Sequence, residues 1–165
     1  MKISLVMPTI NVTTELDLFL KSLKAQTYKD FELIVVDQNE GNEVFEIVKD
    51  YEEEFKIKYV RSDEKGLSLN RNRGLILMKG EIVGFPDDDC EYRPDTLEKV
   101  TEFFKRKKNY QIYSCRTLER GKDYGTGVME KKDMEITKDN VDTTVKSITF
   151  FVNYGKDDIV LFDEN

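Results

Sequence analysis

Residues 81–95 read EIVGFPDDDCEYRPD. An apolar, β-branched run leads straight into three adjacent carboxylates, Asp87, Asp88 and Asp89, and a Pro-Asp pair follows. The run is typical of a buried strand, and Pro94 suits the first turn of a helix. The stretch therefore predicts a strand, a charged strand end and then a helix. Because the three carboxylates repel one another, we also expect a partner that offsets their charge.

The same alternation continues on both sides of this stretch. Further apolar runs predict strands: ISLVM from Ile3, FELIVV from Phe31, IKYV from Ile57, QIYSC from Gln111 and, towards the end, SITFFV and DIVLF. Segments with helical spacing lie between the earlier runs: Leu16 to Leu23 behind the cap candidates Thr13 and Thr14, Val44 to Phe55, Ser68 to about Met78, and Leu97 to Phe104. Strand–helix alternation at this spacing predicts an α/β fold, with a mostly parallel sheet and helices on both faces.

Ligands of such sheets bind beyond the carboxyl ends of the strands. Polar side chains follow three of the predicted strands at those ends. Thr9 and Asn11 follow the first, Asp37 and Gln38 follow the second, and the three aspartates follow the fourth. The sequence therefore predicts a ligand site at this edge of the sheet.

Length and composition narrow the class of protein. A chain of 165 residues suits one domain, and a net charge of −7 disfavours nucleic acid as a partner. The absence of histidine excludes Ser-His and Cys-His nucleophiles and histidine-bound zinc. Cys90 and Cys115 suit reduced, part-buried thiols. No apolar run is long enough to span a bilayer, so we expect a soluble, cytoplasmic protein.

The three aspartates suit a hard divalent cation. Mg²⁺ or Mn²⁺ commonly binds one or two carboxylates together with phosphate oxygens of a ligand. If the strand stays extended, its alternation would turn Asp87 and Asp89 towards one ligand and Asp88 away from it. The competing interpretation is a solvated acidic turn ahead of a helix. We favour the metal site, because a buried strand leads directly into the carboxylates.

Two further groups have both a functional and a structural interpretation. Asp37 at a buried strand end needs a partner, either a nucleotide or the turn that follows. Arg71 and Arg73 lie near a predicted helix start, where an anion such as diphosphate is favoured, although Arg73 suits a surface ion pair equally well. The run Lys105 to Lys108 ends a helix, and its cations suit the helix dipole there.

Four stretches together resemble glycosyltransferase family 2, whose members have the GT-A fold. They are VMPTIN from Val6, LKSLKAQTYKDFELIVVDQ from Leu20, KGLSLNRNRG from Lys65 and KGEIVGFPDDDCEYRPDTLEKV from Lys79. The resemblance covers residues 2 to about 105 and is weak over 106–145. It implies a single GT-A domain over residues 1–165, with a donor-binding half at 1–105 and an incomplete start of the acceptor-side region at 106–165.

The resemblance also implies an activity and a set of roles. The activity is metal-dependent transfer, with inversion, of a sugar from a UDP-, dTDP- or GDP-sugar to a glycan or lipid-linked glycan hydroxyl. Nucleotide-sugar contacts would come from Pro8, Thr9, Asn11, Asp37, Gln38, Arg71, Asp87 and Asp88. Asp87 and Asp89 would bind Mg²⁺ or Mn²⁺. The family's usual settings also allow peripheral membrane association of the full-length protein on its cytoplasmic face.

The chain departs from the family pattern at two points. Gln38 stands where many members have an acidic residue. This difference leaves the identity of the donor's nucleobase open, although the side-chain carbonyl of Gln38 suits a pyrimidine N–H. The chain also ends with FDEN, so we expect the catalytic base beyond residue 165. Among the acids near the end, Asp157, Asp158, Asp163 and Glu164, nothing singles one out.

Three other functions compete with glycosyl transfer. Nucleotidyl transfer would need a glycine-rich basic loop after the first strand, but the sequence there reads PTINVTTE. A donor-binding module without turnover would bind nucleotide and metal but transfer nothing. An acidic α/β interaction domain would show no metal-dependent nucleotide binding.

Overall fold

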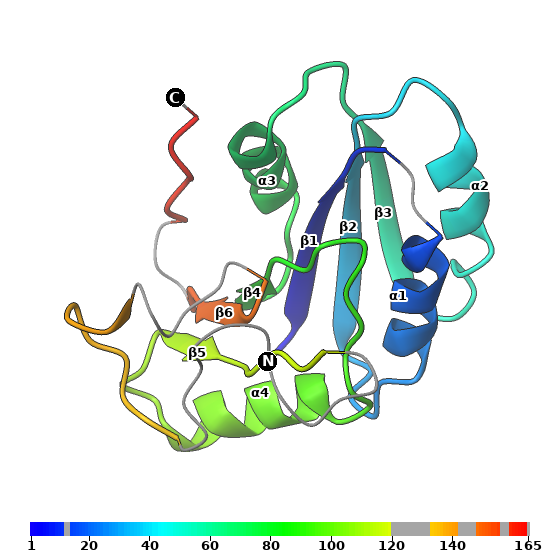
Figure 1. The fold of residues 1–165 in the computed structure, drawn as a ribbon. Coiled ribbons are helices and arrows are strands. Elements are labelled where there is room, and N and C mark those ends of the chain that lie inside the picture. The colour runs from blue at the N-terminus through cyan, green and yellow to red at the C-terminus, as the bar shows by residue number, and fades with distance from the viewer. Residues whose placement is uncertain (12–13, 120–132, 142–147, 156–158, 165) are drawn as a thin grey trace.

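The computed structural model describes residues 1–11, 14–119, 133–141, 148–155 and 159–164. Strands and helices alternate through the first two thirds of the chain (Figure 1). In chain order the elements are β1 Ile3–Thr9, α1 Glu15–Lys24, β2 Phe31–Asp37, α2 Glu43–Lys49, β3 Lys56–Arg61, α3 Leu67–Ile76, β4 Ile82–Gly84, α4 Thr96–Arg106, β5 Ile112–Ser114 and β6 Phe150–Asn153. The predicted α/β alternation is therefore confirmed.

The sheet has the strand order β3-β2-β1-β4-β6-β5. The neighbours among β1 to β4 are parallel, whereas β6 runs antiparallel to both β4 and β5. The chain moves outward from β1 to β3 and then returns to the other side of β1. The strand order thus reverses between β1 and β4, and their carboxyl ends frame the crevice in which ligands of open α/β sheets bind.

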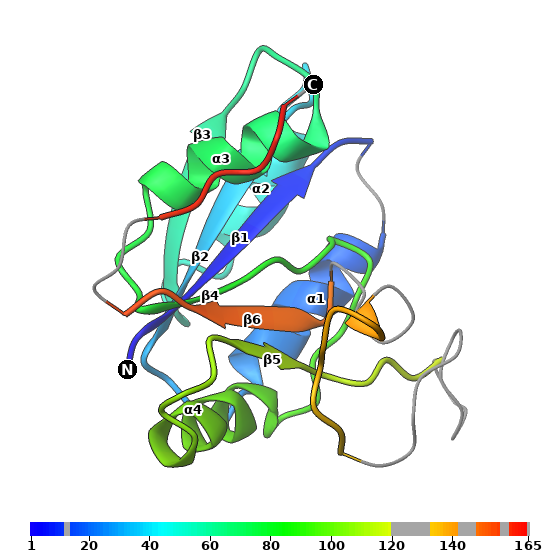
Figure 2. The ribbon, with the colours of Figure 1, turned by 90° about the vertical axis from the view of Figure 1, so that its left-hand side faces the viewer.

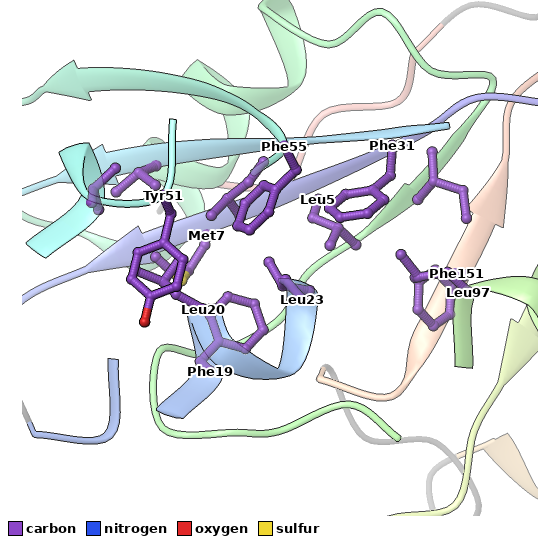
Figure 3. Packing of buried hydrophobic residues seen from close by; sticks show 14 of the residues in the cluster. Leu5, Met7, Phe19, Leu20, Leu23, Phe31, Tyr51, Phe55, Leu97 and Phe151 are labelled. Carbon is purple, nitrogen blue, oxygen red and sulfur yellow. The ribbon is translucent and has the colours of Figure 1, made fainter. Parts of the chain in front are cut away.

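Helices cover both faces of the sheet. Helices α1, α2 and α4 pack on one face, where Figure 3 shows Phe19, Leu20 and Leu23 of α1 against Leu5 and Met7 of β1. Helix α3 packs on the other face, on a second apolar cluster that consists of Val6, Ile34, Val36, Leu75, Val83 and Phe85. Strands β1, β2 and β4 bury side chains on both faces, which explains their nearly continuous apolar sequences.

Close packing on the α3 face requires glycine at one position. A Cβ atom at Gly74 would lie 2.3 Å from Cγ1 of Val6, so glycine lets α3 approach β1. Gly66, directly before α3, has φ +146°, a conformation that side chains rarely adopt. These two glycines fix where α3 starts and how near it lies to the sheet.

Several predicted boundaries were wrong. The strand predicted for DIVLF does not form over residues 159–162; Asp158 lies outside the described residues. The backbone of Phe162 bonds to the side chain of Asn72, and the carbonyl of Val160 accepts from the hydroxyl of Tyr154 at 3.2 Å. Side chains thus take the bonds that a neighbouring strand would have supplied.

The helix ends also differ from the sequence prediction. Helix α2 ends at Lys49, but Tyr51 and Phe55 beyond it still pack into the core. Pro94 precedes α4 instead of lying in its first turn, because Asp95 is the N-cap residue. Thr14 stands at the N-cap of α1 without a side-chain capping bond, and Thr13 lies outside the described residues. Within the part of the chain that the structure covers, no helix is long and apolar enough to span a membrane.

Candidate functional site

The structure joins β1 and β4 at the point where the strand order reverses. Leu5 pairs with Gly84 in the parallel register, and four residues further along each segment stand Thr9 and Asp88. The hydroxyl of Thr9 donates to Oδ2 of Asp88 at 2.5 Å. Thr9 is 1% exposed and Asp88 is partly buried, so the first strand end and the acidic turn meet in a partly buried environment.

Asp87 lies beside a buried cation from α3. Nη2 of Arg71 is 3.7 Å from Oδ1 of Asp87, which is an ion pair longer than a hydrogen bond. Arg71 is 5% exposed, and its Nε–H has no partner within the described residues. A buried hydrogen-bond donor without a partner costs about 1–3 kcal/mol of stability, so this guanidinium is suited to donate to a bound anion. Burial lowers the pKa of Arg71, and the charge of Asp87 raises it in part.

The acidic residues form a turn and not an extended strand end, so the alternation expected from the sequence is not what orients their side chains. Strand β4 ends at Gly84, and Asp88 and Asp89 lie in a turn, so extended alternation does not orient them. The amide and the thiol of Cys90 both bond to the carbonyl of Asp87, at 3.4 and 3.0 Å, and close this turn. Asp88 still points elsewhere than its neighbours, towards β1, while the exposed Asp89 faces solvent.

Burial and neighbouring like charges shift the pKa values of the carboxyl groups in the acidic turn. Burial raises the pKa of Asp87; Arg71 lowers it, and Asp89 and Asp88 raise it further. Burial also raises the pKa of Asp88, the bond from Thr9 lowers it, and Asp89 adds to the rise. The negative charge is therefore only partly offset by Arg71 and Thr9.

A divalent cation fits this set of donors. Asp87 is 45% exposed along its side chain and Asp89 is exposed, so both can present hard oxygen ligands to an ion. Among the residues described, no three acids, cysteines or histidines gather into a ready-made metal cluster. Mg²⁺ and Mn²⁺ sites that include substrate phosphates need only one or two carboxylates.

Asp37 has its partners within the protein. Its carboxylate is fully buried and accepts from the amide N–H of Asn39 at 2.9 Å, from its side chain at 2.7 Å and from the hydroxyl of Tyr59 at 2.5 Å. Arg61 adds a charge at 3.8 Å. The bond to Asn39 is the turn that the structural interpretation expected, so burial of Asp37 requires no nucleotide. Its contact with a nucleoside stays a prediction.

Gln38 links the strand ends to α3. Its backbone N–H and its side-chain Nε2 donate to the carbonyl of Thr9 at 3.0 and 3.4 Å, and its Oε1 accepts from the N–H of Gly66 at 2.8 Å. The carbonyl expected to face a pyrimidine thus already serves the start of α3, with one lone pair left. These hydrogen bonds of Gln38 hold the start of α3, the helix that carries Arg71, against the end of β1.

The remaining predicted residues fall around the same edge. Pro8 is partly buried within β1, and the exposed Asn11 has φ +59° and donates its N–H to Oδ1 of Asn39 at 2.7 Å. Arg73 pairs with Glu64 and Ser62, which favours the surface-ion-pair interpretation. The run Lys105 to Lys108 is exposed and follows the buried part of α4, which ends at Arg106.

Both cysteines are free and partly buried, as predicted. Burial raises the pKa of Cys90 and of Cys115 to about 12 each. The thiols are therefore protonated at neutral pH, which suits packing groups and not nucleophiles.

Sequence reasoning missed Tyr59 and Arg61, which surround Asp37. The parallel register places Arg61 directly opposite Asp37, so aligning the ends of the second and third predicted strands would have found it. It also missed the rings of Phe85 and Phe162, which lie against Arg71. No local pattern signals that contact, because it joins residues far apart in the chain.

The comparisons with known proteins point to glycosyl transferase family 2. The sequence model described as glycosyl transferase family 2 matches residues 4–159. The GalNAc(5)-diNAcBac-PP-undecaprenol beta-1,3-glucosyltransferase of Campylobacter jejuni is 30% identical over 143 residues, which are 83% of this chain and 46% of that protein. The chain therefore spans less than half the length of this curated relative.

Two solved structures share the fold. S. aureus TarS, residues 1–349 in complex with UDP-GlcNAc, has a TM-score of 0.80 at 23% identity and covers 93% of this chain and 45% of its own. The mannosyltransferase PcManGT of Pyrobaculum calidifontis, in complex with GDP-Man and Mn²⁺, has a TM-score of 0.65 at 23% identity, covering 73% and 36%. These matches confirm the predicted GT-A fold.

Proposed function

The chain belongs to glycosyl transferase family 2, and from this premise we propose that it binds a nucleoside-diphosphate sugar for transfer to an acceptor hydroxyl. The donor half of the site comprises residues 1–105, and residues 106–165 begin the acceptor side. The sugar is transferred with inversion to a glycan or lipid-linked glycan. The reaction depends on Mg²⁺ or Mn²⁺.

The observation that carries this proposal is the buried guanidinium of Arg71. It lies at the reversal of the strand order, faces Asp87 and has an Nε–H without a partner in the described residues. A diphosphate in the crevice would supply the missing acceptor and add to the charge that balances the cation. The relatives' own ligands, UDP-GlcNAc for TarS and GDP-Man with Mn²⁺ for PcManGT, are of this chemical class.

We assign the roles by position. Thr9, Asp37 and Gln38 line the nucleoside side with Pro8 and Asn11, and Asp88 reaches the ribose. Arg71 donates to a phosphate oxygen and orients the diphosphate away from the strand ends. Asp87 and Asp89 would hold the ion, which when bound offsets the charge of the departing diphosphate.

Inversion requires a carboxylate that acts as a general base and takes the proton of the acceptor hydroxyl. The acceptor then attacks the sugar from the side opposite the leaving diphosphate. Asp157 and Asp158 lie outside the described residues. Glu164 accepts from the side chain of Asn72 at 2.7 Å, which ties it to α3. We nominate none of the acids in this chain as the base.

Release of nucleoside diphosphate from UDP-, dTDP- and GDP-sugars by the full-length protein, with Mn²⁺ or with EDTA and a panel of glycan acceptors, tests the proposal. We expect release from one donor with Mn²⁺ only, and its loss in Asp89→Ala. Asp50→Ala is the matched control, because this exposed aspartate ends α2 at the opposite edge of the sheet. Binding without release would instead identify a donor-binding module. Release that persists in EDTA would contradict the role of the metal.

A further inference from the structure

The segment Ile159–Glu164 lies along α3, far from it in sequence (Figure 2). The side chain of Asn72 forms three hydrogen bonds with it. The Oδ1 of Asn72 accepts from the N–H of Phe162 at 2.7 Å, and its Nδ2 donates to the carbonyl of Phe162 at 2.9 Å and to Oε1 of Glu164 at 2.7 Å. Asn72 is 3% exposed, and its three bonds to the segment are part-buried. The amide thus fixes the backbone of Phe162 as a neighbouring strand would.

The ring of Phe162 faces Arg71. The Cζ of Arg71 lies 5.5 Å from the centroid of Phe162 and 5.7 Å from that of Phe85, distances at which a cation is attracted to a ring face. The two rings contact each other edge to face, with centroids 5.1 Å apart and planes at 87°. The guanidinium therefore has two aromatic neighbours, one before the acidic turn and one from the distant segment.

Little else in the segment is buried. Val160 is 72% exposed and Leu161 is 51% exposed, so the ring of Phe162 and the amide of Asn72 provide most of the attachment. A ring used only to fill the core would not need a cation beside it. The aromatic contact is instead suited to restrict the rotamers of a long side chain, since Arg loses considerable freedom when it is fixed.

We propose that Phe162, fixed by Asn72, is a positioning residue that holds the guanidinium of Arg71 in place for the diphosphate. This inference rests on the proposed function, in which Arg71 binds phosphate. It assigns to the acceptor-side segment a part in donor affinity, without direct contact with the nucleotide. Removal of the ring should weaken binding of the diphosphate and leave binding of the nucleoside unchanged.

Calorimetric titration of UDP and of uridine, each with Mn²⁺, into a set of variants tests this. Phe162→Leu retains apolar volume but removes the ring, and we expect the Kd for UDP to rise about tenfold. Phe162→Tyr should restore affinity, and Leu161→Ala on the same segment should not change it. In Arg71→Ala, adding Phe162→Leu should have no further effect, because the ring acts through Arg71.

Equal losses for UDP and uridine in Phe162→Leu, or additive effects of the two substitutions, would overturn the proposal and indicate packing alone. If dTDP or GDP is the nucleotide that binds, it and its nucleoside replace UDP and uridine. Exchange of the Arg71 Nε–H with water, measured by NMR without nucleotide, gives a second test. We expect slow exchange in the wild type and in Phe162→Tyr, and faster exchange in Phe162→Leu.

Unchanged exchange in Phe162→Leu would also overturn the proposal. A wild-type protein that binds no nucleotide would refute the proposed function instead. The NMR result would still decide whether Phe162 positions Arg71.

Discussion

Each of the three adjacent aspartates has a different environment. Asp87 faces Arg71, Asp88 accepts from Thr9, and Asp89 is exposed. The charge of the run is thus shared among a cation, a hydroxyl and solvent. This arrangement offsets the charge only in part, and its balance by a bound ion stays a prediction.

The raised pKa of Asp87 and Asp88 predicts how stability depends on pH. Because their folded pKa values lie above the ordinary value of 3.8, the folded state binds more protons than the unfolded state just above that pH. The free energy of unfolding should then fall as the pH rises through this window. Denaturant unfolding from about pH 4 to about pH 7, without divalent ions, measures it.

Asp88→Asn should make this fall shallower, because the amide does not ionise and its carbonyl can still accept from Thr9. Asp50→Asn, an exposed control, should follow the wild type. A fall in Asp88→Asn that is as steep as in the wild type, or steeper, would show that the partly buried carboxylate of Asp88 is not its source.

Residue types at strand ends were readable from the sequence, whereas their partners were not. Thr9, Asp37 and the aspartates were placed at one edge because apolar runs end visibly. The bond from Thr9 to Asp88 and the bond from the hydroxyl of Tyr59 to Asp37 depend on strand order and register. Those features arise from packing between distant segments, which no local pattern records.

At the scale of elements, helix α3 determines the site because it carries Arg71 and approaches β1 closely at Gly74. Gly74→Ala would place a methyl group on Val6, and overpacking of this kind costs about 1–3 kcal/mol. We expect the free energy of unfolding to fall by about this amount, although alanine favours helix by about 1 kcal/mol over glycine. Chemical denaturation measures the change.

A compensating substitution makes this test specific. Val6→Ala combined with Gly74→Ala should recover part of the loss, because it removes the atoms that the new methyl group meets. Ile76→Ala on the same helix is the control, since this side chain is 71% exposed, and should change stability by less than about 0.5 kcal/mol. Equal stability of Gly74→Ala and wild type would contradict the close approach.

The prediction of strands failed at two places, the acidic run and the run DIVLF. The acidic run was expected to extend β4, but Gly84 ends the strand and a turn follows. The apolar letters of DIVLF were read as a strand, but Asn72 binds the backbone there. The apolar composition agrees with the partial burial of Phe162, but it was wrong about the backbone conformation.

At the scale of the whole molecule, parallel strands and helices on both faces followed from the alternation of the first hundred residues. The antiparallel β6 between β4 and β5 did not, because it follows a long segment without clear periodicity. The reversal of strand order between β1 and β4 brings the N-terminal strand and the acidic turn together. Polar residues at the strand ends predicted a ligand site at this edge, the resemblance to family 2 suggested a nucleotide sugar as its ligand, and the strand topology gives the physical reason why these strand ends meet.

The most direct test of the central claim is calorimetric titration of UDP, dTDP and GDP, with and without Mn²⁺, into the wild type and Asp89→Ala. We expect one nucleotide to bind with Mn²⁺ and to bind at least about tenfold more weakly without it or in the variant. Asp50→Ala should bind as the wild type does. Equal binding with and without Mn²⁺ in every protein, or no binding by a folded wild type, would contradict a diphosphate–metal site at the acidic turn.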